Sequence, residues 1–323
     1  MKNVMIYGTL GPACADPAIL QQMLCAGLTG MRLNLSHVSL EEAEDLLRAY
    51  RKTADACGKQ PELLIDMQGP ELRLGALSEP VLLREGDVIG ADTLPFPEML
   101  RDALTEGQEI LLDDGKLLLC AETYGLRVLR GGMLSSRKSV ALPGVSVQTP
   151  ALTEADRHNL RVAAQFGVTG VMQPFVRSKE DLLEVRRAMD EAGLEHARLF
   201  AKIENAEGVR SLDALIPFCD EIVIARGDLG NAVPLWELPA VQKRIAAACR
   251  AANRDFTVVT QMLDSMIRNP VPTRAEVSDV FNAVLDGAAS VMLTGETASG
   301  AYPVEAVRYL VRTVRAAEHF LAE

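Results

Sequence analysis

Charged residues follow two of the short apolar runs of this chain. Lys202 ends the run Leu199–Lys202, and Glu204 lies two residues further on, so a strand would place both side chains on the same face. Asp228 follows the run Glu221–Ile224. If the two runs are neighbouring strands, Glu204 and Asp228 can share a hard divalent cation through their carboxylate oxygens.

Two arginines extend this set of charges. Arg32 lies within the run Met31–Leu33, and Arg73 follows the run Leu63–Asp66. With Lys202 they can hold an anion, and arginine is suited to bidentate contacts with phosphate. Two carboxylates, a metal ion and three cations together predict a phosphoryl-transfer site. The alternative for each residue alone is a structural ion pair.

Further polar side chains follow the other apolar runs. Asn34, Ser36 and Asp66 form an oxygen-rich set suited to a monovalent cation, although Asn and Ser after a strand also simply cap turns. Other polar or aromatic residues that end or follow the apolar runs are Thr9, His37, Glu71, Gln173, Phe175, Arg177, Arg226, Thr260, Gln261, Thr294 and Glu296. Because such residues follow every apolar run, the sequence favours one functional site built from the ends of the predicted strands over unrelated ion pairs.

Eight apolar runs alternate with amphipathic helical patterns and predict eight strands. Several helices have recognisable ends: Asp16-Pro17 and Gly27 bound one, Ser39 with Glu42 forms a capping box before another, and Thr153 begins a third. Eight strand–helix units favour a closed (β/α)₈ TIM barrel, an α/β fold whose chemistry lies at the C-terminal ends of its strands. The predicted strands are Val4–Tyr7, Met31–Leu33, Leu63–Asp66, Gly170–Gln173, Leu199–Lys202, Glu221–Ile224, Phe256–Thr260 and Ser290–Leu293.

One long interval interrupts this rhythm. About 100 residues separate the third and fourth predicted strands, whereas a βαβ unit needs roughly 30. The excess contains short β-like runs separated by Gly and Asp turns. We therefore expect a small all-β domain at 74–142, inserted after strand 3 of a barrel formed by 1–73 and 143–323.

Composition excludes several classes of protein. The 323 residues are 48% hydrophobic and 24% charged, which is typical of a globular protein, and the net charge of −11 weighs against broad nucleic-acid binding. No apolar run reaches the 18 residues of a membrane span. The six widely spaced cysteines predict reduced thiols rather than zinc ligands or disulfides. We expect a cytoplasmic protein without nucleic-acid or membrane partners.

The chain resembles the pyruvate kinase family along essentially its whole length. The most specific matching segments are AKIENAEGV, ARGDLG, TQMLDSM, NPVPTRAEVSDVFNAVLDGA and MLTGETASGAYPVEAV, in the family's order. The resemblance implies a barrel with a β-rich lid and phosphoryl transfer from phosphoenolpyruvate to ADP, giving pyruvate and ATP in glycolysis. It also implies Mg²⁺ (or Mn²⁺) and K⁺ as cofactors.

Matched position by position, the resemblance implies individual roles. Lys202, Arg32, Arg73, Thr260, Thr294 and Glu296 would be catalytic, and Arg32, Lys202, Gly227, Asp228 and Thr260 would bind substrate. The nucleotide would be bound by Thr9, His37, Arg73, Asp114 and Lys138. Mg²⁺ would be held by Glu204 and Asp228, and K⁺ by Asn34, Ser36, Asp66 and the backbone of Met67. Glu71 matches the K⁺-dependent branch of the family.

Some positions depart from the family pattern. Met67 stands where Thr or Leu is usual, Pro174 replaces a Ser beside Lys202, and Thr294 replaces a Ser. The predicted lid is short, and the chain stops after the eighth barrel helix, where the family continues into an effector domain. From this we expect no response to sugar phosphates and at most a homodimer through barrel helices.

Two alternatives remain open. One is a paralogue that acts on a related phospho- or enolpyruvate substrate, favoured by Pro174 and the short lid. The other is a non-catalytic protein that binds phosphoenolpyruvate or nucleotide, against which every charged catalytic position that can be matched is intact.

Overall fold

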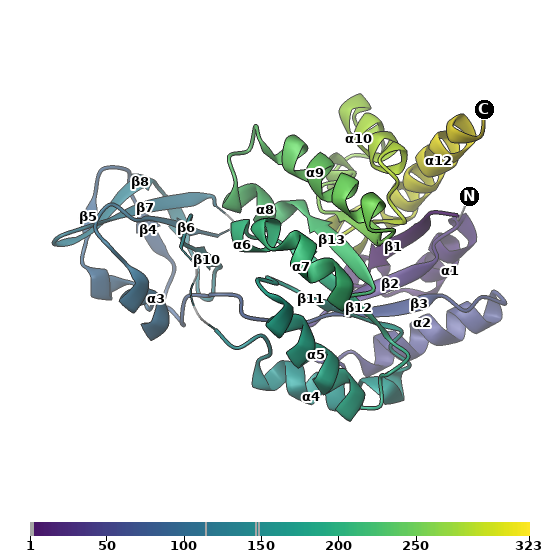
Figure 1. The fold of residues 1–323 in the computed structure, drawn as a ribbon, viewed down its shortest axis with the longest axis horizontal. Coiled ribbons are helices and arrows are strands. Elements are labelled where there is room, and N and C mark those ends of the chain that lie inside the picture. The colour runs from purple at the N-terminus through teal and green to yellow at the C-terminus, as the bar shows by residue number, and fades with distance from the viewer. Residues whose placement is uncertain (1–2, 114, 146, 148) are drawn as a thin grey trace.

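A parallel barrel with an insert of antiparallel strands makes up the chain (Figure 1). The computed structural model describes residues 3–113, 115–145, 147 and 149–323. The barrel and its helices occupy one side of the view, with the N- and C-termini near each other, and the insert extends from the opposite side (Figure 1).

The eight predicted strands are confirmed and form a closed barrel. Neighbours around it are β1, β15, β14, β13, β12, β11, β3 and β2, and all pairs are parallel. Most strand residues are buried, as near-continuous apolar runs in parallel sheets predict. The strands are β1 (Met5–Thr9), β2 (Gly30–Asn34), β3 (Glu62–Asp66), β11 (Gly170–Gln173), β12 (Arg198–Ile203), β13 (Glu221–Ala225), β14 (Asp255–Val259) and β15 (Ser290–Met292).

Helices cover the outside of the barrel. Around it lie α1 (Pro17–Ala26), α2 (Glu44–Ala56), α4 (Glu154–Ala163), α5 (Lys179–Glu191), α6 (Ala206–Arg210), α7 (Leu212–Leu215), α8 (Arg226–Ala232), α9 (Leu238–Ala251), α10 (Arg274–Leu285), α11 (Gly295–Ala298) and α12 (Pro303–Ala322). Short 3₁₀ turns are η1 (Pro12–Cys14), η3 (Ala164–Phe166), η4 (Ile216–Phe218) and η5 (Asp264–Ile267).

The predicted helix ends agree with the structure in two of three cases. The Asp16 carboxylate accepts the Ala18 N–H at 2.8 Å, and Gly27 ends α1 with a φ of 120°. Thr153 begins α4 with a complete capping box. The prediction for α2 was wrong: Ser39 and Glu42 exchange the expected hydrogen bonds, but they close a separate turn and the helix begins at Glu44.

The insert, residues 74–142, follows β3 and is built mainly from antiparallel strands, as predicted. One sheet has the order β10 (Val140–Ala141), β6 (Glu109–Leu112), β7 (Leu117–Glu122), β8 (Gly125–Arg130) and β5 (Val88–Ile89). A second pairs β4 (Val81–Leu83) with β9 (Gly132–Leu134). The insert also contains α3 (Glu98–Ala103) and the turn η2 (Ala91–Thr93), which the sequence analysis did not predict.

Separate hydrophobic clusters stabilise these parts. One fills the inside of the barrel around Tyr7, Phe200 and Met292, and a larger one packs the barrel against its helices. The insert has its own cluster, which includes Phe96, Ile110 and Leu119. The division between barrel and insert at 74 and 142 therefore remains a prediction that these separate cores support.

Two further expectations concern chemistry outside the site. The six cysteines are free thiols, as the wide spacing predicts. No helix in the described part of the chain combines the length and apolar character that a membrane span requires.

Candidate functional site

A cavity of about 310 Å³ lies where the C-terminal ends of the barrel strands face the insert. The predicted residues that line it are Arg32, Asn34, Ser36, His37, Asp66, Met67, Arg73, Lys138, Lys202 and Asp228. They come from β2, β3, β12 and the insert, or from the residues just after those strands and β13. Tertiary folding thus brings together most of the residues that the sequence analysis selected.

Asp66 is the shared partner of two cations in this cavity. Its carboxylate accepts hydrogen bonds from Lys202 Nζ at 3.0 and 3.1 Å and from Arg32 Nε at 2.8 Å. Asp66 is only 2% exposed, and the Arg32 and Lys202 side chains are each 12% exposed. Hydrogen bonds between charged groups in such a buried place hold side chains in fixed positions.

Glu204 is a second partner of Lys202. Its Oε1 lies 3.0 Å from Lys202 Nζ, and its Oε2 accepts the Phe175 N–H at 2.8 Å. Phe175 has a φ of 52°, a left-handed conformation that is uncommon outside glycine. Burial alone would lower the pKa of Lys202, but the carboxylates of Asp66 and Glu204 outweigh burial and raise it, so the lysine stays cationic.

Arg73 and Glu71 form an ion pair at the insert side of the cavity. Arg73 Nε and Nη2 lie 2.9 and 2.8 Å from Glu71 Oε2, and Arg73 Nη1 donates to the Arg137 carbonyl at 3.0 Å. Burial raises the pKa of Glu71, although Arg73 opposes this. Burial also lowers the pKa of His37, helped by the positive charges of Arg73 and Arg32, which favours a neutral imidazole at pH 7.

The predicted divalent-metal residues lie on neighbouring strand ends. Glu204, 3% exposed, and Asp228 both line a second cavity of about 180 Å³ that adjoins the first. Among the described residues, no cluster of three or more His, Cys, Asp or Glu side chains forms a metal site. Mg²⁺ is commonly held by one or two carboxylates together with substrate phosphate and water, so this donor pair fits Mg²⁺.

The predicted K⁺ residues line the first cavity together. Asn34 Oδ1 accepts the Ser36 N–H at 3.2 Å, which closes a tight turn after β2. The N–H of Met67 donates to the Met172 carbonyl at 3.1 Å. Amide, hydroxyl, carboxylate and carbonyl oxygens are the donors that hard cations prefer, so these residues fit a monovalent cation.

Thr260 and Gly227 also lie close to each other. Thr260 has a φ of 76° and Gln261 a φ of 55°, so two consecutive residues after β14 adopt the left-handed conformation. The Arg226 guanidinium donates to the Thr260 carbonyl at 2.8 and 3.1 Å. A side chain at Gly227 would approach the Thr260 methyl group to 3.1 Å. Strained backbone of this kind is concentrated at functional sites.

Five predicted site residues in the described part of the chain line neither of these cavities: Thr9, Gly227, Thr260, Thr294 and Glu296. Glu296, 1% exposed, accepts the Leu263 N–H at 3.0 Å and the Thr294 N–H at 2.7 Å, so it braces two loops. Thr9 donates to the Leu293 carbonyl at 2.9 Å and accepts from Arg32 at 3.3 Å. In this structure Thr9, Thr294 and Glu296 brace the loops and Arg32 beside the cavities and do not line them.

An ion pair of the insert at the cavity includes a residue that the sequence analysis did not select, Asp113. Lys138 Nζ lies 2.7 Å from Asp113 Oδ1, and both residues line the larger cavity. The sequence analysis selected the adjacent Asp114, which lies outside the described residues. The sequence shows two consecutive aspartates but not which of them pairs with Lys138. That depends on the backbone of the turn, in which Asp113 has a φ of 49°.

Known proteins resemble this chain over nearly all of its length. A family model described as "Pyruvate kinase, barrel domain" matches residues 1–307. A pyruvate kinase of Geobacillus stearothermophilus is 38% identical over 341 residues, covering 98% of this chain but 58% of that relative. A pyruvate kinase of Aeropyrum pernix is 39% identical over 322 residues, covering 96% of this chain and 69% of that relative. The chain thus spans less than two thirds of the first relative's length.

Proposed function

Because the chain belongs to the pyruvate kinase family, we propose that it transfers a phosphoryl group from phosphoenolpyruvate to ADP. In this reaction the bond between phosphorus and the enol oxygen breaks, and a bond from phosphorus to an ADP phosphate oxygen forms. The enolate then takes a proton at its methylene carbon and becomes pyruvate.

The observation that carries the proposal is the position of Lys202. Its ammonium is cationic, nearly buried and held by Asp66 and Glu204 at 3.0–3.1 Å. A fixed positive charge of this kind stabilises the negative charge that shifts between phosphoryl and enol oxygens during transfer. Because its partners already orient it, little reorganisation is needed when the reaction occurs.

The other cations have complementary roles in the proposal. Arg32 is oriented by Asp66, and Arg73 is oriented by Glu71, so both guanidinium groups are held at the cavity. We assign them to the phosphoryl group, to which a guanidinium can donate two parallel hydrogen bonds. Asp66, Glu71 and Glu204 thus hold the three cations in place before the anionic substrate binds.

Two cations from solution complete the proposed site. Glu204 and Asp228 would hold Mg²⁺, and Asn34, Ser36, Asp66 and Met67 would hold K⁺. When bound, these ions supply positive charge that neutralises substrate oxygens. Thr260, beside Gly227, is the proposed residue for orienting the proton donor to the enolate carbon.

We assign the nucleotide to the side of the cavity next to the insert. His37 and Lys138 both line the cavity, and the insert would act as a lid that closes over the nucleotide. Thr9 would act on the same side by orienting Arg32. A cytoplasmic location, a homodimer through barrel helices and catalytic roles for Thr294 and Glu296 also remain predictions.

A coupled assay tests the proposal. Pyruvate formation from phosphoenolpyruvate and ADP is measured with and without Mg²⁺, and we expect turnover only with the divalent cation. Binding of phosphoenolpyruvate without turnover would favour the non-catalytic alternative. Turnover only with a different phosphorylated substrate would favour the paralogue, for which Pro174 beside the site is the supporting observation.

A further inference from the structure

Two chain segments join the barrel to the insert. Close to the insert they pair with each other: the Leu74 N–H donates to the Lys138 carbonyl at 2.9 Å, and the Val140 N–H donates to the Leu72 carbonyl at 2.8 Å. Nearer the barrel the two segments separate, and each contacts a charged side chain of the barrel.

The outgoing segment is held by Asp156. This residue is fully buried in the first turn of α4, and its carboxylate accepts the Gln68 N–H at 2.7 Å and the Gly69 N–H at 3.0 Å. The same carboxylate accepts the Thr153 N–H at 2.9 Å and the Thr153 hydroxyl at 2.8 Å. Asp156 therefore joins the start of the outgoing segment to the end of the returning one.

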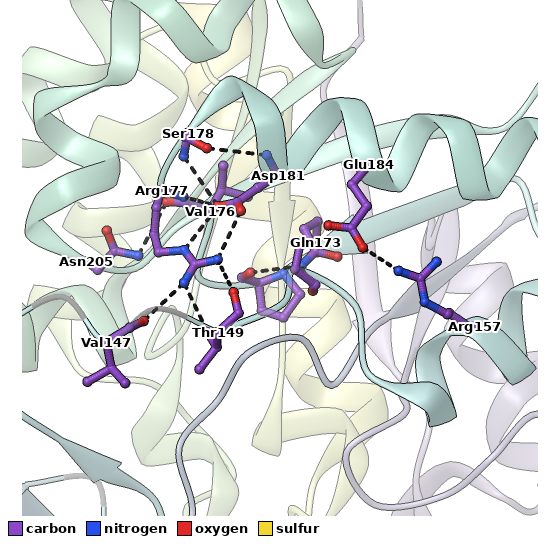
Figure 2. Close-up of polar contacts among 12 residues, drawn as sticks. Val147, Thr149, Arg157, Gln173, Val176, Arg177, Ser178, Asp181, Glu184 and Asn205 are labelled. Carbon is purple, nitrogen blue, oxygen red and sulfur yellow. Dashed lines mark hydrogen bonds and ion pairs between the residues drawn. The ribbon is translucent and has the colours of Figure 1, made fainter. Parts of the chain in front are cut away.

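The returning segment is held by Arg177 (Figure 2). The Arg177 guanidinium donates to the Val147 carbonyl at 3.1 Å, to the Thr149 hydroxyl at 3.0 Å and to the Thr149 carbonyl at 2.7 Å. Asp181, one turn into α5, holds the opposite edge of the guanidinium at 3.0 and 3.1 Å. Gln173 then donates to the Ala151 carbonyl at 2.7 Å.

These contacts limit where the chain can bend. In the returning segment, hydrogen bonds tie Val147, Thr149 and Ala151 to the barrel. Gly144 differs: it has a φ of 79°, and no neighbouring atom lies within 4 Å of the position that a Cβ atom would take. Gly144 therefore lies between the last contact with the insert, from Gln108 to the Pro143 carbonyl at 3.0 Å, and the Arg177 contacts on the barrel side, and it is the described residue best suited to act as a hinge. Glycine in the left-handed conformation permits such a change in backbone angles.

We propose that Arg177 is a positioning residue that holds the barrel end of this hinge and so determines how Lys138 of the insert stands over the nucleotide. Only the expected effect on ADP kinetics rests on the proposed function; the anchoring of the hinge by Arg177 does not. Val147, Thr149 and Arg177 line the smaller cavity together with Glu204 and Asp228, so displacement of the hinge end also changes the edge of the site.

Arg177→Gln and Arg177→Lys are the test variants. Glutamine has too few N–H donors to reach Val147, both Thr149 acceptors and Asp181 at once. Lysine keeps the positive charge but lacks the planar set of donors that a guanidinium has. The matched control is Arg157→Gln, which removes the ion pair from Arg157 to Glu184 between α4 and α5 and touches no hinge residue (Figure 2). Thr149→Val removes one acceptor and leaves the pair of Arg177 with Asp181 intact.

Hydrogen exchange of peptides covering 142–153 is the readout that does not depend on activity. We expect exchange to accelerate about tenfold in Arg177→Gln, less in Arg177→Lys and Thr149→Val, and not at all in Arg157→Gln, because charged hydrogen bonds contribute this much to local stability. Unchanged exchange in both Arg177 variants would overturn the proposed hinge anchor, whatever reaction the protein catalyses.

Kinetics separate a positioning role from a purely structural one. We expect the KM for ADP to rise about threefold or more in Arg177→Gln, with partial rescue in Arg177→Lys and a smaller change in the KM for phosphoenolpyruvate. A lowered melting temperature with an unchanged KM for ADP would show that Arg177 serves stability alone. If the parent protein forms no pyruvate, the proposed function fails, while the exchange result still decides whether Arg177 anchors the hinge.

Discussion

Lys202 Nζ lies 3.0 Å from Asp66 Oδ2, although the two residues are 136 positions apart and their strands are not neighbours in the barrel. Strand β11 separates β12 from β3, so the side chains meet across the barrel mouth. The contact gives a nearly buried lysine a permanent counter-charge. Together with Glu204, it raises the pKa of Lys202 against the opposing effect of burial.

Removal of the Lys202 charge tests the chemistry. Lys202→Met should lower kcat by about 100-fold or more and change KM less, because the charge acts as the phosphoryl group leaves. Steady-state kinetics of pyruvate formation measure both constants. Lys179→Met, a change at an exposed lysine of α5, should leave both unchanged. Turnover of Lys202→Met within a few-fold of the parent would refute the assigned role.

A dependence on K⁺ is expected from the cluster of Asn34, Ser36 and Asp66, which lines the cavity with oxygen donors. Adding K⁺ to an enzyme assayed in tetramethylammonium buffer should raise the rate of pyruvate formation. Tetramethylammonium is too large for such a site, and its methyl groups keep its charge away from the oxygen donors. Equal rates in the two buffers would argue against a monovalent-cation site.

Lys138 should bind nucleotide through its position on the insert. Lys138→Ala should raise the KM for ADP several-fold, since it removes a positive charge from the cavity. Lys116→Ala is the matched control, because Lys116 also pairs with Asp113, at 3.2 Å, but is 67% exposed. An equal KM change in both variants would mean that Asp113, rather than direct contact with nucleotide, is responsible.

Gly69 should be intolerant of a side chain. It has a φ of 60°, and a Cβ atom there would lie 2.4 Å from Pro174 Cγ. Gly58 has a φ of 63° but no atom within 4 Å of its Cβ position, so Gly58→Ala measures the backbone cost alone, about 1 kcal/mol. Gly69→Ala should cost about 1–3 kcal/mol more in denaturant unfolding. An equal loss of unfolding free energy in the two variants would show that Pro174 moves aside without strain.

Glu276 should stabilise the fold in a pH-dependent way. Burial tends to raise its pKa, but hydrogen bonds from Ser265 and Thr273, at 2.6–2.9 Å, outweigh burial and lower it. A pKa below that of the unfolded chain means that stabilisation is complete above the unfolded pKa of 4.5 and is lost as pH falls through the folded value.

Glu276→Gln is the variant that tests this pH dependence. It should be less stable than the parent by about 1–2 kcal/mol at pH 7, the scale of hydrogen bonds to a charged group. Denaturant unfolding of both proteins from pH 7 to pH 3 measures the difference, which should shrink below pH 4.5. A difference that stays constant over this range would exclude the carboxylate charge as its source.

Much of the architecture could be predicted from short-range patterns. Apolar runs such as Gly170–Gln173 and caps such as Thr153 act through hydrogen bonds and packing within a few residues, so the sequence displays them directly. The same locality explains one error. Ser39 and Glu42 form the bonds of a capping box, but the pattern does not reveal that a separate turn precedes α2.

The sequence by itself therefore determined the eight strand–helix units, the position of the insert and the polar character of the strand ends. Only the tertiary structure decided which partner each charge has. Asp66 joins Arg32 to Lys202, whereas Glu296, another carboxylate near the end of a strand, accepts backbone N–H groups and lines neither cavity. A charged side chain bonds to whichever groups the closed barrel brings within about 3 Å, and those groups are distant in sequence.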